Sequence, residues 1–262
     1  AEASAQQVQG GVQVTGSHNP ADDNGFKIVF GGRALFGDEI RRIGVLAGEA
    51  GVDSGLPRGS IERLDLQSAY VERLAEDWRG AVARGGGLMA EVAACLRIGW
   101  DAGNGAGGPV LEALVARLPG EHILLFTEVD GHFPHHHPDP TEEVNLADLR
   151  SLVASRQLDF GVAFDGDADR IVVVDARGRV ILGDQLLAIL AADLLQDQPD
   201  ALILADVKAS QAVFDHIATL GGRCAMGAAG HSLIKSTMKQ SGAILAGETS
   251  GHIFYADRYY GF

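Results

Sequence analysis

Residues 158–178 read LDFGVAFDGDADRIVVVDARG, two β-rich apolar runs joined by a short acidic turn. Beyond this stretch, other short apolar runs alternate with segments whose apolar residues recur about every 3.6 positions, as in amphipathic helices. The expected strands are 11–14, 26–30, 96–100, 122–127, 160–164, 171–175, 201–205 and 243–246. The expected helices are 38–47, 65–78, 109–117, 146–156, 184–195 and 210–220, and residues 79–91 are expected to form a linker or insertion. This alternation predicts an α/β architecture with mixed, mainly parallel sheets.

The composition is that of an ordinary globular protein with an excess of acidic residues. The chain has 262 residues, of which 46% are hydrophobic, and its formal net charge is −14. This charge argues against nucleic-acid and anionic-membrane partners, which need clustered Lys and Arg. Only Cys95 and Cys224 are present, and no signal peptide or membrane-spanning segment is recognised. These features predict a cytoplasmic protein that acts on a small molecule.

Three carboxylates, on Asp165, Asp167 and Asp169, alternate along the acidic turn. Carboxylates this close repel one another unless they bind a hard cation. The turn is not an EF-hand, because Arg170 stands where that loop needs glycine and Ala176 where it needs glutamate. Open coordination positions suit Mg²⁺ shared with a phosphoryl oxygen, and the Arg170 guanidinium can bind the same phosphate. A solvated acidic turn without a ligand is the less favoured alternative.

Residues 15–20, TGSHNP, follow an expected strand and end it sharply. The glycine permits an unusual backbone angle and the Asn-Pro pair forces a turn, so Ser17 and His18 are expected at a loop tip. Lys27 lies on the next expected strand, from which its ammonium group can return to this loop and stabilise phosphate charge. Ser17 does not fit the G-x-S-x-G pattern of hydrolases. Taken alone, such a segment is more often an ordinary polar turn.

Residues 247–252, GETSGH, follow the expected strand at 243–246. Glu248 and Ser250 are two positions apart on an extended chain, so their side chains point the same way. They can therefore hydrogen-bond adjacent hydroxyl groups of a sugar. Taken alone, the segment is better explained as a glycine-flanked turn.

Residues 103–108, GNGAGG, match the G-x-G-x-x-G pattern of dinucleotide-binding folds, and Glu128 follows at the end of the next expected strand. Close packing of a strand against a helix explains the same glycines equally well, because Pro109 follows and the unit is short. No other segment suggests hydride chemistry. An NAD-dependent oxidoreductase is therefore kept as a minor alternative.

Histidines at 132, 135, 136 and 137 suggest a metal site, but their setting disfavours zinc. Three consecutive imidazoles cannot all face one ion on an extended chain. Prolines at 134, 138 and 140 make the segment a rigid loop.

The three loops at 15–20, 165–170 and 247–252 resemble, in this order, the signature loops of the α-D-phosphohexomutase family. The resemblance is greatest for its bacterial phosphomannomutase/phosphoglucomutase branch. It extends to NGFKIV (24–29), DAGNGAGG (101–108), GHFPHHHPDP (131–140) followed by Glu143 and Asn145, DVK (206–208) and GHSLIK (230–235).

The resemblance implies tandem phosphohexomutase-type α/β domains. Residues 1–66 would form the C-terminal part of domain I with the phosphoserine loop, and residues 67–179 domain II with the metal-binding loop. Residues 180–262 would form an incomplete domain III with the sugar-binding loop, and domain IV would lie outside the sequence. Because domain IV grips the phosphate that is not reacting, turnover by this chain alone is expected to be impaired.

The resemblance also implies roles for individual residues. The catalytic residues implied are Ser17, which is phosphorylated in the resting enzyme, His18, Lys27 and Arg170. The implied ligands of one Mg²⁺ ion are Ser17, Asp165, Asp167 and Asp169. The implied substrate-binding residues are Lys208, His231, Glu248, Ser250 and His252.

The function implied by the resemblance is the interconversion of hexose 1-phosphate and hexose 6-phosphate, with mannose and glucose as the sugars. Ser17 would give its phosphoryl group to the free sugar hydroxyl, and the bound hexose 1,6-bisphosphate would turn and return its other phosphate. The bisphosphate is both activator and intermediate, and a monomer is expected. Phosphoglucosamine mutase and a non-catalytic sugar-phosphate-binding relative are the alternatives. One departure is Ala228, which stands where the branch usually has lysine.

Overall fold

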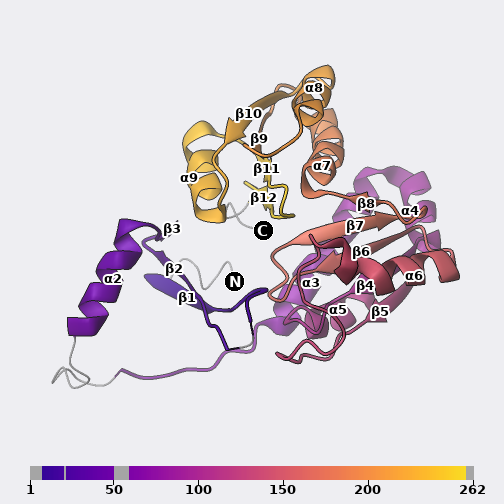
Figure 1. Ribbon diagram of the computed structural model, residues 1–262. Helices are drawn as coiled ribbons and strands as arrows, with labels where there is room; N and C mark the ends of the chain where they lie inside the picture. The colour runs from indigo at the N-terminus through magenta and orange to yellow at the C-terminus, as the bar shows by residue number, and fades with distance from the viewer. Residues whose placement is uncertain (1–7, 21, 50–58, 258–262) are drawn as a thin grey trace.

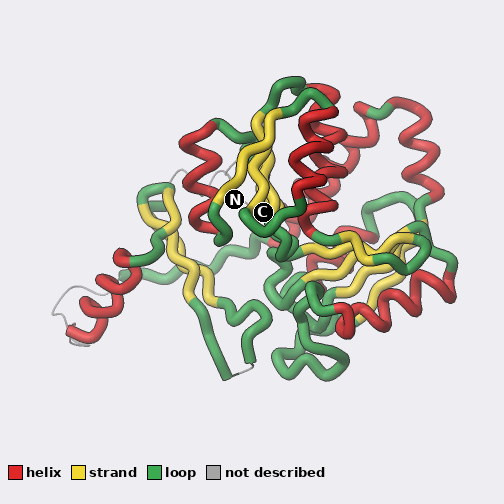
Figure 2. Tube along the Cα trace, turned by 45° about the horizontal axis from the view of Figure 1, so that its top comes forward, coloured by secondary structure: helices red, strands yellow, loops and turns green. Residues whose placement is uncertain are grey.

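The protein is described by a computed structural model that covers residues 8–20, 22–49 and 59–257. Three sheets follow one another along the chain, and helices flank the second and third (Figures 1 and 2). The fold is therefore α/β with mixed sheets, as expected. Within the described residues, no helix has the length and apolarity needed to cross a membrane.

The first sheet is antiparallel and carries the serine loop, residues 15–20, between its first two strands. Its strands, in sheet order, are β1 (Gly10–Val14), β2 (Phe26–Phe30) and β3 (Arg33–Ala34). Lys27 on β2 lies opposite Gln13 on β1, next to the pair at the base of the loop. Helix α2 (Asp38–Glu49) follows, and none of its residues is buried.

The second sheet has three parallel strands at one side and antiparallel pairing at the other. Its strands, in sheet order, are β5 (Glu121–Leu125), β4 (Arg97–Asp101), β6 (Phe160–Phe164), β7 (Ile171–Asp175) and β8 (Val180–Ile181). Its helices are α3 (Gln67–Arg84), α4 (Gly86–Cys95), α5 (Gly108–Val115), the 3₁₀ turn η1 (Glu143–Leu146) and α6 (Ala147–Arg156). Because β4 and β6 are parallel, the loops that follow them leave the same edge of the sheet.

Apolar packing fixes the second sheet against its helices. Leu149 and Val153 on α6 are buried with Leu158 against β6 and β7. Each such side chain contributes about 1.5–3 kcal/mol when fully buried. Helices α3 and α5 contact each other on the other side of the sheet (Figure 1). This core holds the edge from which the acidic loop, residues 165–170, projects.

The third sheet repeats this arrangement. Its strands, in sheet order, are β10 (Arg223–Gly227), β9 (Leu202–Asp206), β11 (Leu245–Gly247) and β12 (Ile253–Tyr255), of which only β12 is antiparallel. Its helices are α7 (Gly183–Asp197), α8 (Gln211–Thr219) and α9 (His231–Ser241), with α9 on the face opposite to α7 and α8 (Figure 1). The loops that follow the three parallel strands share one edge, as in other open α/β sheets that bind ligands there.

Of the two expectations for residues 79–91, the linker was wrong, and the insertion stays a prediction. Helix α3 continues to Arg84, and α4 begins at Gly86 and packs on α3. The error has a physical cause, because Leu88 and Met89 on α4 are exposed and give no amphipathic pattern. Alanine supplies the helix propensity instead. The sequence also failed to predict β3, β8, β10, β12 and α9, of which the strands are short or weakly apolar.

Candidate active site

The acidic loop, residues 165–170, is a tight turn that gathers its carboxylates. Asp165 is buried at the end of β6, and its Oδ1 atom accepts hydrogen bonds from the N–H groups of Asp169 (3.0 Å) and Arg170 (3.1 Å). One carboxylate oxygen from each of Asp165, Asp167 and Asp169 lies within 4.8 Å of the others. The alternation seen in the sequence therefore becomes one cluster.

The glycines at 103–108 pack closely against the backbone of this loop. A Cβ atom on Gly105 would lie 2.7 Å from the Gly166 carbonyl oxygen, and one on Gly107 would lie 2.9 Å from the Ala168 Cβ atom. The Ala106 N–H group donates to the Gly166 carbonyl at 2.9 Å. These glycines thus permit one backbone to pack directly on another.

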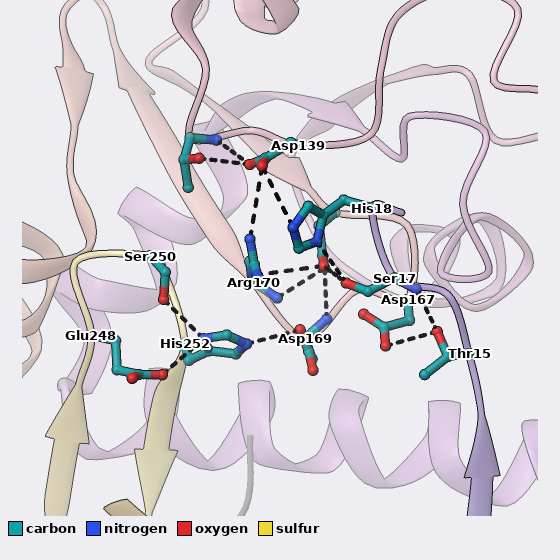
Figure 3. Close-up of polar contacts among 12 residues, drawn as sticks. Thr15, Ser17, His18, Asp139, Asp167, Asp169, Arg170, Glu248, Ser250 and His252 are labelled. Atoms are coloured by element: carbon teal, nitrogen blue, oxygen red, sulfur yellow. Dashed lines mark hydrogen bonds and ion pairs between the residues drawn. The ribbon is translucent and has the colours of Figure 1, made fainter. Parts of the chain in front are cut away.

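The serine loop meets the acidic loop directly (Figure 3). The Ser17 hydroxyl donates to Asp165 Oδ2 at 2.6 Å, and the Thr15 hydroxyl donates to Asp167 Oδ2 at 2.9 Å. The Ser17 carbonyl oxygen would lie 2.1 Å from a Cβ atom on Gly166, so only glycine allows this approach. Two loops that are about 150 residues apart in the chain therefore form one site.

Lys27 joins the same cluster from β2. Its ammonium group donates to Asp167 at 2.8 Å and to Asp169 at 2.5 Å. Burial lowers the pKa of Lys27, but these hydrogen bonds outweigh burial and raise the pKa above its ordinary value. Burial raises the pKa of Asp169, and hydrogen bonds from His252 and Lys27 more than reverse that effect, so its pKa is lowered. Both groups are therefore held in their charged forms.

The cluster fits a hard divalent cation. Burial, together with the charges of Asp167 and Asp169, raises the pKa of Asp165 to about 6, although the Ser17 hydrogen bond opposes this. The Oδ1 atom of Asp167 is buried and has no hydrogen-bond partner in the described part of the chain. Buried carboxylates with an unsatisfied oxygen gain from a cation, and an all-oxygen donor set suits Mg²⁺.

His18 contacts the serine, and Arg170 lies near Asp165, the carboxylate that the serine contacts. His18 Nδ1 lies 3.1 Å from the Ser17 Oγ atom. Arg170 Nε lies 3.9 Å from Asp165 Oδ2, and it is buried without a hydrogen-bond partner among the described residues. Burial, and then the charge of Arg170, lowers the pKa of His18. Nitrogen donors on these two side chains are therefore available to bind a phosphate beside Ser17.

The 247–252 loop belongs to the third sheet and contacts the acidic loop. His252 Nε2 contacts Asp169 Oδ1 at 3.1 Å, while its Nδ1 lies 2.9 Å from both Glu248 Oε2 and Ser250 Oγ (Figure 3). The Gly251 carbonyl accepts from the N–H group of Ile171, at the start of β7. Glu248 and Ser250 thus both face His252, although residues 248–251 form a turn and not the extended chain expected from the sequence.

Lys208 and His231 lie around this loop. Asp206 accepts from the Lys208 N–H group at 2.8 Å and from the Thr249 N–H group at 3.0 Å, so the two loops are tied together. The Lys208 residue is exposed. The His231 ring lies 6.4 Å, centroid to centroid, from that of His252.

A cavity of about 960 Å³ opens between the first sheet, the acidic loop and α9. Its lining includes Lys27, Asp167, Asp169, His231 and Lys235. Carboxylate and cationic groups that could contact a bound sugar phosphate therefore share one open space. Ser17 lies beside this cavity rather than in its lining, because its hydroxyl points into the carboxylate cluster.

The histidines of the 131–140 segment face different partners. His136 Nε2 contacts the buried Asp101 at 3.1 Å, and His135 Nδ1 contacts Asn104 at 2.7 Å. His132 pairs with Asp130 on the surface. The contacts of His135 and His136 brace the loop that leads to Asp139.

Sequence reasoning did not assign Asp139, although its carboxylate lies 3.9 Å from both His18 and Arg170. It also left open what the glycines at 103–108 approach. No feature of the sequence indicates the neighbours of Asp139 or the group that these glycines approach. Both depend on which loops meet at one edge of the second sheet.

Three family models match the chain in succession. They are described as phosphoglucomutase/phosphomannomutase alpha/beta/alpha domains I, II and III, and they match residues 2–46, 69–178 and 182–261. A phosphomannomutase/phosphoglucomutase from Pseudomonas putida is 43% identical over 252 residues, which are 96% of this chain and 51% of that protein. The chain thus spans about half the length of the curated relatives it matches.

Solved structures share the fold. A phosphoglucomutase/phosphomannomutase family protein from Burkholderia thailandensis has a TM-score of 0.83 and 39% identity, covering 97% of this chain and 53% of that chain. Aspergillus fumigatus N-acetylphosphoglucosamine mutase, solved in complex with GlcNAc-6P and magnesium, has a TM-score of 0.63. That match covers 95% of this chain and 61% of the other at 20% identity, which supports the fold alone.

Proposed function

The chain belongs to the phosphoglucomutase/phosphomannomutase family, and from this premise we propose that it interconverts hexose 1-phosphate and hexose 6-phosphate. The substrates would be glucose and mannose phosphates, with Ser17 as the phosphoryl carrier and hexose 1,6-bisphosphate as activator and intermediate. One observation carries the proposal: the Ser17 hydroxyl lies 2.6 Å from Asp165, within a cluster of three carboxylates and Lys27.

One Mg²⁺ ion would be held by Asp165, Asp167, Asp169 and the oxygen of Ser17. When bound, the ion neutralises charge on a phosphoryl oxygen and helps to orient the group for in-line transfer. The unsatisfied Oδ1 atom of Asp167 supports this assignment.

The surrounding residues would manage charge and protons during transfer. The free hydroxyl of the bound sugar phosphate attacks the phosphorus of phosphorylated Ser17, so that a sugar O–P bond forms and the Ser17 O–P bond breaks. The net proton transfer is from the sugar hydroxyl to Ser17 Oγ. His18, whose Nδ1 atom lies 3.1 Å from Oγ, would give Oγ its proton, and the proton lost by the sugar hydroxyl would restore the imidazole. Lys27 and Arg170 offset the charge of the transferring group.

The 247–252 loop would bind the sugar. Glu248 and Ser250 can each pair with a hydroxyl, and a carboxylate beside a hydroxyl accepts either orientation of a hexose ring. His252 joins this pair to Asp169, so sugar and phosphoryl sites are mechanically linked. His231 lines the cavity beside Lys27, and Lys208 lies on the neighbouring loop, so both are proposed as further substrate contacts.

The domain boundaries proposed are those expected from the sequence, 1–66, 67–179 and 180–262. The grouping of the described strands into three successive sheets supports them. We also propose a cytoplasmic monomer with hexose phosphates as its partners and no nucleic-acid or membrane partner, which the net charge of −14 favours.

The test is phosphorylation of Ser17. Incubation with glucose 1,6-bisphosphate and MgCl₂ should add one phosphoryl group, seen by intact mass spectrometry and mapped to Ser17 by peptide analysis. Ser17→Ala should abolish this gain and any mutase activity in a coupled assay with glucose 1-phosphate. Ser155→Ala, which changes an exposed serine on α6, is the matched control. Phosphorylation that persists in Ser17→Ala would refute the proposal.

A further inference from the structure

Asp139 is held in one orientation by its own loop. Its Oδ1 atom accepts from the N–H group of Thr141 at 3.0 Å and from the Thr141 hydroxyl at 2.6 Å. Its carbonyl oxygen accepts from the buried Asn145 at 2.7 Å, and Pro138 and Pro140 on either side are buried. Two hydrogen bonds to Oδ1 fix the plane of the carboxylate and leave Oδ2 free to face the site.

That second oxygen faces two of the proposed catalytic groups at once. Asp139 Oδ2 lies 3.9 Å from His18 Nε2 and 3.9 Å from an Arg170 terminal nitrogen (Figure 3). The side chains of Asp139 and Arg170 are 15% and 18% exposed, so water screens this contact only in part. At 3.9 Å the contacts are electrostatic rather than hydrogen bonds.

The consequence is an orientation of both groups toward Ser17. An imidazole ring that turns Nε2 to the carboxylate turns Nδ1 the other way, and that atom lies 3.1 Å from Ser17 Oγ. The Arg170 guanidinium, attracted to Asp139 from one side, keeps Nε 3.9 Å from Asp165. The Asp139 charge adds to the Ser17 contact in favouring this ring orientation over its flipped form, which would turn ring carbons toward both partners.

We propose that Asp139 is a positioning residue that holds His18 and Arg170 around the Ser17 hydroxyl during phosphoryl transfer. The inference rests on the proposed function, because it assigns Asp139 a part in the Ser17 reaction. Asp139 acts through the two groups that it faces. The arrangement follows the logic of a carboxylate that orients a histidine beside a nucleophilic serine.

Asp139→Asn is the decisive variant, because the amide keeps the shape and can still accept both Thr141 hydrogen bonds at Oδ1. It loses only the charge that faces His18 and Arg170. We expect the kcat and the rate of Ser17 phosphorylation by glucose 1,6-bisphosphate to fall about 10- to 100-fold, at the low end for proton-transfer groups because the contact is long. The KM and the thermal midpoint should change little. Asp130→Asn, in the same loop but on the surface, is the matched control.

A double-variant cycle separates positioning from a structural role. If Asp139 acts through His18, then Asp139→Asn should cost at least about threefold less in a His18→Gln background than in the wild type. Should Asp139→Asn fold poorly, Asp139→Glu keeps the charge and should retain more activity than Asp139→Asn. Fully multiplicative losses, or an unchanged kcat in folded Asp139→Asn, would overturn the inference. A wild-type chain that never gains phosphate on Ser17 would instead overturn the proposed function.

Discussion

Replacing Gly166 with alanine is expected to separate the serine loop from the acidic loop. The new Cβ atom would lie 2.1 Å from the Ser17 carbonyl oxygen and 3.0 Å from the Ser17 carbonyl carbon. Both are backbone atoms, so no side chain can rotate away to make room. Ordinary contact needs at least 3.4 Å, so the two loops must move apart by about 3.4 − 2.1 = 1.3 Å.

This displacement determines how far the rate of Ser17 phosphorylation should fall. The 2.6 Å hydrogen bond from Ser17 to Asp165 would be broken, because 1.3 Å of separation takes it far beyond hydrogen-bond range. A misplacement of about 1 Å at a reacting group costs about 100-fold in rate. We therefore expect Ser17 phosphorylation by glucose 1,6-bisphosphate to slow by about 100-fold or more. The secondary structure should remain, because the clash lies between two loops and not within a core.

Intact mass spectrometry over time measures the rate, and circular dichroism checks the fold. Gly44→Ala is the matched control, because Gly44 is a helical position on α2 where a Cβ atom meets nothing within 4 Å. The control should phosphorylate at the wild-type rate. Wild-type kinetics in Gly166→Ala would refute the reasoning, because they would mean that the serine does not work at the distance seen here.

The remaining predictions concern the metal, the stability of the loop and the sugar site. Asp167→Asn should weaken Mg²⁺ binding at least about 10-fold in isothermal titration calorimetry, and unchanged affinity would place the ion elsewhere. The hydrogen bond to Asp101 raises the pKa of His136, so its stabilising contribution is complete below the ordinary value of 6.5 and is lost as pH rises through the raised value. In urea unfolding, His136→Gln should thus lower the free energy of unfolding most at low pH. A loss of unfolding free energy that grows with pH would contradict this. His252→Gln removes the contact with Asp169 and should raise the KM for glucose 1-phosphate about 10-fold in steady-state assays, whereas a wild-type KM would separate His252 from sugar binding.

Local pattern was sufficient to predict much of the fold. The strands on either side of the acidic turn, β6 and β7, have the predicted bounds because their apolar runs end at charged residues. Helix α4 escaped prediction because its apolar side chains face solvent and its stability comes from alanine and from contact with α3. Strand β10, RCAMG, has one parallel neighbour and too little apolar character to be recognised alone.

The site was predictable where a loop carries its own chemistry. Asp165, Asp167 and Asp169 lie in one turn, so their cluster follows from spacing alone. Asp139 is different, because its role depends on a loop that crosses the edge of the second sheet. The residues that it faces are 121 positions before it and 31 after it, as 139 − 18 and 170 − 139 show. Such relations arise from topology, and no periodicity encodes them.

The glycine pattern at 103–108 has one use in a dinucleotide-binding fold and another in this chain. In a dinucleotide-binding fold, the second glycine lets a pyrophosphate approach the backbone, and the third lets a helix pack on a strand. Here Gly108, at the start of α5, lets that helix pack on the segment that follows β5, since its Cβ atom would lie 2.0 Å from the Thr127 carbonyl oxygen. Gly105 likewise lets a polar group approach the backbone closely, but that group is the Gly166 carbonyl of the acidic loop and not a pyrophosphate. The pattern thus marks a place where a polar group meets bare backbone at a strand's carboxyl end. In this chain that group is the loop that gathers the carboxylates beside Ser17, so the same glycines support the proposed phosphoryl-transfer site through backbone contacts.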